Sequence, residues 1–360
     1  MNPVQNSPPL AVAFAPDWSQ DNPYQANLQA ALQRENVVVS FAQPRMWDFP
    51  LAEASMKPGT QLLHLHFPGA FFNPTGRLWR ILTRKLIYWI DFQRALSHCP
   101  LVLTAHNLYP HNRRDEFLVS PLIRMTHARA RAIIAHSAAA AETIQNEFGI
   151  ASEKMHVIPH GTTDEEPPAL FRLSPAEARA RLGLNTEKPV CLMFGMMDPY
   201  KGIEEVIRFW KAQSPDCDLC LVGSPNSPGY GLTLAALVDH HPHIHFEPKR
   251  LTDDELTLWL RAANCVLFNY VHILTSGAAV QARSLGIPVL LPHRLRTIDL
   301  REPHPLVTRF AGFENDFAPA LKSALATQPD YSLAADFREA TSWTRVGQAT
   351  ARVYRSILEN

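Results

Sequence analysis

Residues 190–206 read VCLMFGMMDPYKGIEEV, the pattern of a buried strand followed by a tight turn and a helix. The apolar run Val190–Phe194 predicts the strand, Gly195 the turn, and Lys201-Gly202 the start of the helix. A helix N-terminus offers free backbone N–H groups and a positive dipole end, and a nearby lysine adds a mobile charge, so a phosphate fits there. Taken alone, the stretch also fits a solvated lysine beside a turn glycine.

The same pattern recurs at residues 268–289, which read FNYVHILTSGAAVQARSLGIPV. A predicted strand again leads into a loop, and Thr275-Ser276-Gly277 starts a helix of small residues. The hydroxyl groups can act as ordinary helix N-caps, or they can bind a diphosphate together with the free N–H groups. Two such turns in one domain arise by chance less readily than one, so we interpret the pair as a candidate anion site.

Along the rest of the chain, short apolar strands alternate with helical patterns, which is typical of parallel, doubly wound α/β sheets. The first series of predicted strands comprises Leu10–Ala15, Val37–Phe41, Leu62–His66, Leu101–Ala105, Ala132–Ala135 and Met155–Ile158. The second series comprises Val190–Phe194, Asp218–Val222, His243–Phe246, Cys265–Phe268 and Val289–Leu291. Between them, residues 161–185 contain an acidic linker and a Ser174-Pro175-x-Glu177 helix start. We therefore expect two Rossmann-like domains, residues 1–165 and 166–342, that face a central cleft where ligands bind.

Composition excludes several classes of protein. The 360 residues exceed what one hydrophobic core usually organises, and 46% hydrophobic with 19% charged residues excludes wholesale disorder. The 34 basic residues balance 34 acidic ones, so no basic field indicates nucleic acid. No apolar run reaches the roughly 18 residues of a membrane span, no signal peptide is evident, and the five cysteines form no disulfide framework. We expect a cytoplasmic protein, with peripheral contact at the inner face of the membrane left open.

Three groups of residues together resemble GT-B glycosyltransferases of the family 4-like group, which use nucleotide sugars. They are the Tyr200-Lys201-Gly202 helix start, the small-residue helix ending in Ser284-Leu285-Gly286, and Ile158-Pro159-His160-Gly161. The resemblance covers nearly the whole chain and implies that residues 343–360 form a helix crossing back onto the N-terminal domain. Segments 22–25, 105–111 and 274–277 are most similar to bacterial exopolysaccharide β-mannosyltransferases of xanthan-type pathways.

The resemblance implies a set of donor-binding residues in the C-terminal domain: Gly195, Tyr200, Lys201, Gly202, Lys249, Arg250, Tyr270, Thr275, Ser276, Gly277 and Gln281. Two departures from the family pattern matter. Ile273 and Gln281 occupy the positions of a glutamate pair, and residues 196–198 lack an arginine that is common there. A retaining mechanism therefore does not follow from the resemblance. Lys201 and Ser276 are expected to hold most of the diphosphate.

In the N-terminal domain, His106 follows a predicted strand and is expected at the carboxyl edge of the sheet. The resemblance implies that it contacts the donor sugar or its leaving oxygen, and an imidazole can also act as a base near neutral pH. An ordinary structural hydrogen bond is the alternative. His111, Asp115 and Glu116 on the following loop are the other catalytic candidates toward an acceptor hydroxyl.

Other features of the sequence leave alternatives open. His64 and His66 share one face of their strand by alternation, where they either line the acceptor site or serve the structure. The histidines at positions 240, 241, 243 and 245 lack partners at zinc-site spacing, so no metal and no cofactor are expected. Residues 77–89, RLWRILTRKLIYW, fit either a helix on an anionic membrane or a core helix with a solvated basic side.

We therefore expect a metal-independent glycosyltransferase. It would move a hexose, with mannose preferred on resemblance, from a nucleotide diphosphate sugar to a saccharide or polyprenyl-linked acceptor. Positive groups of the protein would neutralise the leaving diphosphate. One alternative is a retaining family 4-type transferase that uses a UDP-sugar. The other is a catalytically silent GT-B protein that binds a glycan or a partner, which the missing glutamate pair suggests.

Overall fold

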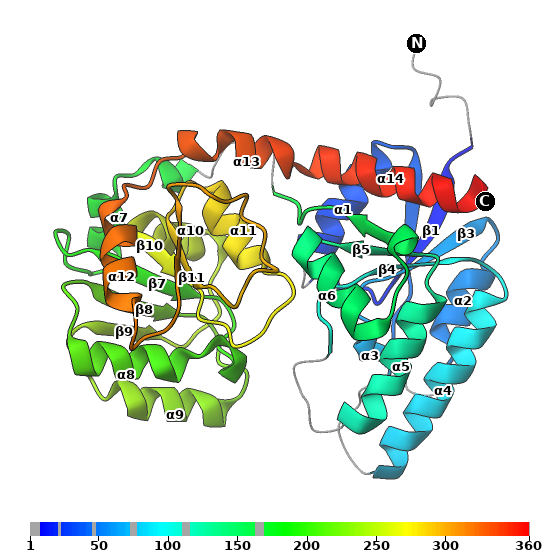
Figure 1. Ribbon diagram of the computed structural model, residues 1–360, viewed down its shortest axis with the longest axis horizontal. Helices are drawn as coiled ribbons and strands as arrows, with labels where there is room; N and C mark the ends of the chain where they lie inside the picture. Colours follow the sequence, from blue (N-terminus) through cyan, green and yellow to red (C-terminus); the bar gives the residue numbers. More distant parts are fainter. Residues whose placement is uncertain are drawn as a thin grey trace. The chain divides into compact units, whose positions relative to one another are not determined.

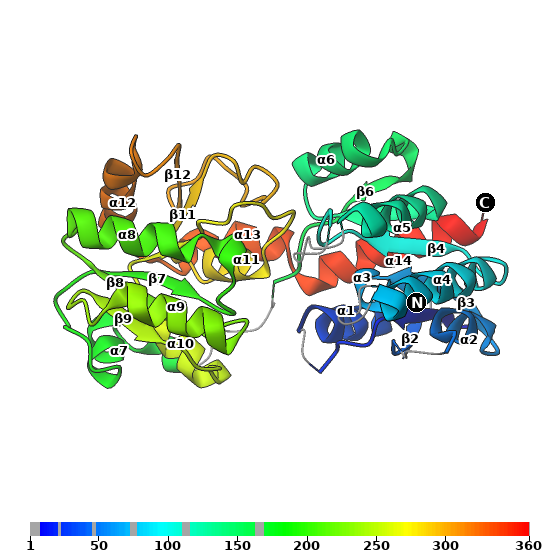
Figure 2. The same cartoon turned by 90° about the horizontal axis from the view of Figure 1, so that it is seen from below.

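A computed structural model describes residues 8–20, 23–44, 48–72, 78–109, 116–162 and 169–359, without the side chains of 78 and 116–118. The chain divides into two compact units, residues 1–161 with 341–360 and residues 162–340. Each unit is built on a six-stranded parallel sheet with helices on both faces (Figures 1 and 2). These boundaries differ by a few residues from the expected ones at 165/166 and 342/343.

The sheet of the first unit has the strand order β2-β1-β3-β4-β5-β6. Its strands are β1 (Leu10–Ala15), β2 (Val37–Phe41), β3 (Thr60–Leu65), β4 (Leu101–Thr104), β5 (Ala132–Ala135) and β6 (Met155–Val157). Every residue of β4 and β5 is buried, because central parallel strands are covered on both faces. The six strands predicted for this half of the chain are confirmed, with ends that differ by at most about two residues.

Helices of the first unit are α1 (Pro23–Gln33), α2 (Pro50–Met56), α3 (Gly69–Phe72), α4 (Leu78–Leu96), α5 (Glu116–Arg129), α6 (Ala138–Phe148) and α14 (Trp343–Glu359). Helices α1 and α14 share one core with the sheet, in which Leu28 and Val346 are buried. Gly161 permits this packing because the Trp343 indole occupies the space that a Cβ would need. The C-terminal helix is therefore part of the first unit.

Helix α4 buries two of its basic residues, Arg84 and Lys85. Asp91 accepts hydrogen bonds from the backbone N–H groups of Leu51 (3.1 Å) and Ala52 (2.8 Å), so a carboxylate lies at the N-terminus of α2. Arg84 interacts electrostatically with this Asp91, and both Arg84 and Lys85 are buried. The prediction of a solvated basic side was therefore wrong for these two residues. The exposed side instead carries two tryptophans and two leucines: Trp79, Leu82, Leu86 and Trp89.

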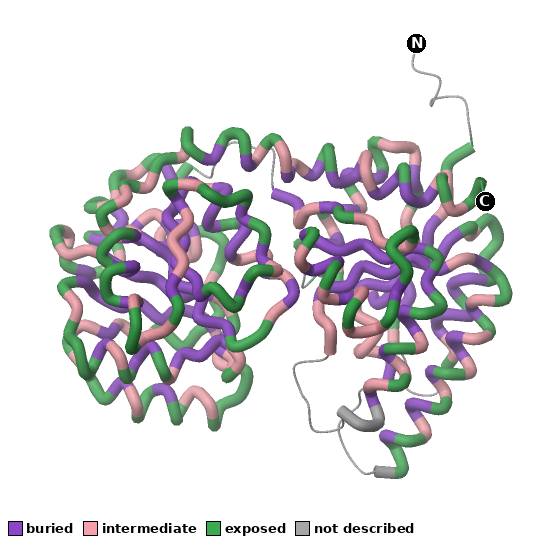
Figure 3. The backbone as a smooth tube through the Cα atoms, in the orientation of Figure 1, coloured by how far each residue is buried: buried purple, intermediate pink, exposed green. Residues whose placement is uncertain are grey.

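The sheet of the second unit has the order β12-β11-β10-β7-β8-β9. Its strands are β7 (Val190–Phe194), β8 (Asp218–Val222), β9 (Ile244–Glu247), β10 (Cys265–Leu267), β11 (Val289–Pro292) and β12 (Val307–Phe310). Its helices are α7 (Pro175–Arg181), α8 (Ile203–Gln213), α9 (Pro228–Val238), α10 (Asp253–Ala262), α11 (Gly277–Ser284), α12 (Phe317–Ala326) and α13 (Ala335–Ala340). One core packs α8, α9 and α12 on the sheet, and the other packs α10, α11 and α13. Figure 3 shows the strands buried and the outer helix faces exposed.

Candidate functional site

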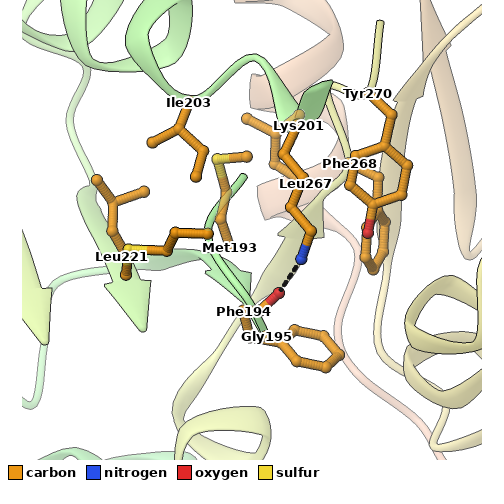
Figure 4. Close-up of a pocket in the computed structure, with 10 residues that line it drawn as sticks. Met193, Phe194, Gly195, Lys201, Ile203, Leu221, Leu267, Phe268 and Tyr270 are labelled. Carbon is orange, nitrogen blue, oxygen red and sulfur yellow. Dashed lines mark hydrogen bonds between the residues drawn. The ribbon is translucent and has the colours of Figure 1, made fainter. Parts of the chain in front are cut away.

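Lys201 lies in a short 3₁₀ helix, η5 (Pro199–Lys201), between the carboxyl end of β7 and the start of α8. The residue is 8% exposed, and its Nζ donates to the Phe194 carbonyl oxygen at 3.1 Å. Nζ also lies 5.7 Å from the centre of the Tyr270 ring, beside a small cavity (Figure 4). Burial lowers the pKa of Lys201 to about 8, and Asp198 offsets part of this effect. An anion nearby would stabilise the charged form of this buried lysine.

Ser276 approaches the same tyrosine from the other predicted turn. It is the N-cap of α11, where its Oγ accepts the N–H of Ala279 at 3.2 Å, and Oγ lies 3.5 Å from the Tyr270 hydroxyl. The ring of Tyr200 lies 5.5 Å from that of Tyr270. Two segments separated by about 70 residues of sequence are thus brought together at the carboxyl ends of β7 and β10.

Gly202 makes the close approach of these segments possible. It joins η5 to α8 with a φ of +63°, in the left-handed region that glycine tolerates best. A Cβ here would lie 2.6 Å from Asn269 Nδ2 and 2.7 Å from the Asn269 carbonyl oxygen. Both conformation and space therefore require glycine. Gly195, the other predicted turn glycine, lines the cavity beside Lys201.

The remaining donor candidates fall into two groups. Thr275 and Gly277 flank Ser276 at the start of α11, and Gln281 is exposed farther along that helix. Lys249 and Arg250 follow β9, two strands away from β7 in the sheet. Both are exposed, and Lys249 Nζ forms an ion pair with Glu255 Oε1 at 2.8 Å. Their role with a nucleotide base stays a prediction.

A second candidate region lies at the carboxyl edge of the first sheet, where successive strands are followed by histidines: His66 after β3, His106 after β4, His136 after β5 and His160 after β6. Neighbouring ring centres along this row are 5.8, 5.1 and 5.4 Å apart. The Tyr24 ring lies within 5.8 Å of all four. His136 was not among the predicted site residues, although its place after a strand matches that of His106.

These four histidines, which we call the histidine row, are neutral at pH 7. Burial, followed by repulsion from the neighbouring imidazoles, lowers the pKa of His106 and His66 well below the usual value. Burial also lowers the pKa of His136 to about 3 and that of His160 to about 4. Within the described residues, Nε2 of His106 and of His136 and both ring nitrogens of His66 have no hydrogen-bond partner. Buried polar atoms normally have one, so this edge suits hydroxyl groups of a ligand or water.

His64 serves the structure. Its Nδ1 lies 2.6 Å from the Tyr354 hydroxyl and its Nε2 2.8 Å from the Thr104 hydroxyl. It shares a strand face with His66, as predicted, with ring centres 4.1 Å apart. Because both nitrogens are occupied, His64 connects the sheet to α14 and is not available to an acceptor.

Three catalytic candidates cannot be placed in this way. His111 and Asp115 lie outside the described residues, and Glu116 begins α5 with a side chain that is also outside them.

In the second unit, His243 and His245 contact the two oxygens of Asp218 at 3.2 and 3.1 Å, at the amino ends of the strands. No group of His, Cys, Asp and Glu in the described parts of the chain has the arrangement of a metal site. None of the described helices is long and apolar enough to span a bilayer.

Comparison with known proteins gives these residues a family context. Residues 11–166 match the model for glycosyltransferase family 4. The chain is 25% identical to a GDP-mannose:glycolipid 4-beta-D-mannosyltransferase of Xanthomonas campestris pv. campestris, over 98% of this chain and 94% of that protein. It is 28% identical to a D-inositol 3-phosphate glycosyltransferase of Streptomyces avermitilis, over 64% of this chain and 53% of that protein.

Solved structures share the fold at low sequence identity. Sucrose-phosphate synthase from Thermosynechococcus elongatus superposes with a TM-score of 0.71 and 18% identity, over 98% of this chain and 99% of that chain. Anabaena HepE in complex with UDP and glucose gives a TM-score of 0.67 at 13% identity, over 96% and 99% of the two chains. The predicted fold class, GT-B, is confirmed. The chain therefore has the GT-B fold, and its residues 11–166 match glycosyltransferase family 4.

Proposed function

We propose that this enzyme transfers mannose from GDP-mannose to a glycolipid acceptor, with inversion at the sugar carbon and without a metal ion. The near-full-length similarity to a GDP-mannose:glycolipid 4-beta-D-mannosyltransferase supports the choice of donor and acceptor. The observation that carries the donor assignment is the buried Lys201, which lies beside the ring of Tyr270, whose hydroxyl in turn lies next to the Ser276 hydroxyl. A cation at this place suits a diphosphate.

Lys201 supplies the charge that a nucleotide diphosphate needs as it leaves. The leaving group gains negative charge in the transition state, and preorganised positive groups stabilise that charge in a site shielded from water. Metal ions do this in other transferases. Here the burial that depresses the Lys201 pKa also strengthens its attraction to an anion. Ser276 adds a hydroxyl at the N-terminus of α11.

His106 is assigned a hydrogen bond to the transferred sugar through Nε2, which has no partner in the described residues. Its pKa lies well below 6.5 because of burial and the three neighbouring histidines. The imidazolium form is therefore strongly disfavoured, and a neutral hydrogen-bonding role fits the surroundings better than a role as the base that accepts a proton. His111, Asp115 and Glu116 stay the candidates for the base that an inverting transfer requires.

A glycolipid acceptor places the enzyme at a membrane surface, and α4 offers a face for that contact. Trp79, Leu82, Leu86 and Trp89 follow helical spacing and are 46–57% exposed. The one acidic residue of α4, Asp91, is buried, and Arg80 and Arg94 are exposed. Tryptophan and leucine with flanking arginines suit the interface of an anionic bilayer. We propose that this apolar face, and not a basic one, lies on the lipid.

Transfer from each of a panel of nucleotide sugars to a lipid-linked saccharide tests the proposal, with proton NMR of the product. We expect turnover with GDP-mannose, a β-linked product and unchanged rates in EDTA. Turnover restricted to a UDP-sugar with an α-linked product would instead support the retaining alternative. Loss of activity in EDTA that Mg²⁺ or Mn²⁺ restores would contradict the metal-independent mechanism.

A further inference from the structure

The loop that follows β11 reaches across to the candidate donor site through one arginine. Arg294 Nε donates to the Tyr270 carbonyl oxygen at 2.9 Å. Its Nη2 donates to the Asn269 carbonyl oxygen at 3.2 Å and to the Asn269 side-chain Oδ1 at 2.7 Å. The guanidinium group therefore holds two consecutive peptide units directly after β10, on the segment that carries Tyr270.

Asn269 passes this contact on to the turn that carries Lys201. It is fully buried, and its Nδ2 donates to the Gly202 carbonyl oxygen at 3.1 Å and to Glu205 Oε2 at 2.9 Å. Because Arg294 fixes Oδ1, the amide nitrogen is oriented toward Gly202. A second link joins the same segments, since the Val271 N–H donates to the Tyr200 carbonyl oxygen at 2.7 Å.

The loop that carries Arg294 is itself held in place. Arg309 on β12 binds both carboxylate oxygens of Glu302 and donates to the carbonyl oxygens of Pro292 and Leu295, on either side of Arg294. Thr297 also donates to the Ile273 carbonyl oxygen at 2.8 Å. Because its loop is held, the planar guanidinium group of Arg294 fixes the orientation of the groups that it binds, and it also places a positive charge beside them.

We propose that Arg294, acting through Asn269, is a positioning residue for the nucleotide diphosphate. It fixes the Lys201-Gly202 turn against the Tyr270–Ser276 segment, so that the ammonium group and the Ser276 hydroxyl are set before the donor binds. Preorganisation of this kind raises affinity without a direct contact. The consequence for binding rests on the proposed role of Lys201. The hydrogen bonds from Arg294 to the 269–270 segment and from Asn269 to Gly202, which we call the clamp, are a property of the ligand-free protein.

The clamp is tested first without a ligand, by peptide-resolved hydrogen exchange over residues 196–204 and 268–274. In Arg294→Ala, exchange of these segments becomes roughly tenfold faster while the melting temperature changes little. Arg296→Ala removes the same charge from an exposed arginine on the same loop, and its exchange stays at the wild-type rate. Unchanged exchange in Arg294→Ala, or equal acceleration in Arg296→Ala, overturns the clamp.

Calorimetric titration with GDP and guanosine then tests the consequence. Arg294→Ala weakens GDP binding about 3- to 10-fold, the range for losing one to two hydrogen bonds, and leaves guanosine binding unchanged. In a Lys201→Ala background the further effect of Arg294→Ala on GDP affinity is clearly smaller than in the wild type, because the residue acts largely through Lys201. Arg294→Lys does not restore affinity, since a compact ammonium group lacks the planar fork whose Nε and Nη2 reach the two carbonyl groups and Oδ1.

The outcomes separate the two ideas. Restored affinity in Arg294→Lys, or additive losses in the double variant, contradicts positioning and indicates a direct charge effect. If Lys201→Ala weakens GDP binding and Arg294→Ala does not, the inference fails and the proposed function stands. If Lys201→Ala has no effect on GDP binding, the proposed donor site fails, and the hydrogen-exchange result still decides the clamp.

Discussion

The carboxyl edges of the two sheets differ in charge, although both units have the same kind of fold. The edge of the first sheet carries the histidine row, whose members are buried and neutral around Tyr24. The edge of the second sheet carries Lys201, a buried cation beside Tyr270 and Ser276. A neutral polar edge suits the hydroxyl groups of sugars, and a cationic edge suits a diphosphate. The same architecture thus presents two chemically distinct surfaces, set by the residues that follow each strand.

The largest effect is expected at the neutral edge. Replacing His106 by Ala should lower the turnover rate roughly 10²–10³-fold, the range for losing one preorganised hydrogen bond to the transition state. GDP affinity should change little, because the diphosphate is assigned to the other unit. His106→Asn keeps a hydrogen-bond donor and should recover part of the rate. A folded His106→Ala enzyme within about threefold of the wild-type rate would remove His106 from the mechanism.

A smaller effect is expected where the first unit meets lipid. Leu86→Glu places a charge on the exposed face of α4 and should weaken binding to vesicles of phosphatidylethanolamine and phosphatidylglycerol about tenfold. Leu232→Glu is the matched control, because Leu232 is an exposed leucine on α9 of the second unit. Flotation assays compare the two variants with the wild type. Equal binding of both variants contradicts the assignment of this face.

The cationic edge predicts how GDP affinity depends on pH. The pKa of Lys201 is about 8 in the free protein because of burial, and a bound diphosphate should raise it. The ammonium form is then lost from the free enzyme as pH rises above 8, so binding at pH 9 should be several-fold weaker than at pH 7.5 and should take up protons. Titration in buffers of different ionisation enthalpy measures that uptake. Absence of proton uptake at pH 9 is the contrary result.

The histidine row predicts that the free energy of unfolding falls as pH falls, whereas GDP affinity falls as pH rises. The histidine row has folded-state pKa values below 6.5, with His136 at about 3 and His160 at about 4, owing to burial. As pH falls below 6.5, the unfolded chain binds protons that the folded chain does not, so the free energy of unfolding decreases. The loss at pH 5.5 should be about 1 kcal/mol for each buried histidine.

Calorimetric melting at pH 7.5 and pH 5.5 measures this loss. His136→Phe removes one titrating group from the row and should show a smaller drop in melting temperature between the two pH values than the wild type. An identical drop in both proteins is incompatible with a neutral, buried His136.

Local sequence patterns predicted most of the elements, including the strand and turn that carry Lys201. The strand Val190–Phe194 and the Lys201-Gly202 turn follow from neighbouring residues, and the structure places them as expected. Strand β12 was missed because Thr308 and Arg309 interrupt its apolar pattern at the edge of the sheet. Local patterns cannot supply partners from distant parts of the chain, so the contact between Asn269 and Arg294 was missed.

The exposed face of α4 shows the same limit more sharply. The helical spacing of residues 77–89 correctly predicted a helix, which the structure extends to Leu96. Spacing alone gives two faces and does not say which one is buried. The decision rests on Asp91, which receives the N–H groups of α2 and interacts with Arg84. Helix α2 itself was not predicted. Which face of α4 is buried therefore depends on α2, an element that the sequence pattern did not predict.

The most direct test of the account is calorimetric titration of GDP and guanosine into the wild type and Lys201→Ala, with Lys322→Ala as the control for an exposed lysine. Loss of a charged hydrogen bond of about 1.5–3 kcal/mol should weaken GDP binding about 10- to 150-fold in Lys201→Ala and leave guanosine binding unchanged. Lys322→Ala should match the wild type for both ligands. Equal losses for GDP and guanosine in Lys201→Ala, or none for GDP, would contradict the assignment of the cationic edge to the diphosphate.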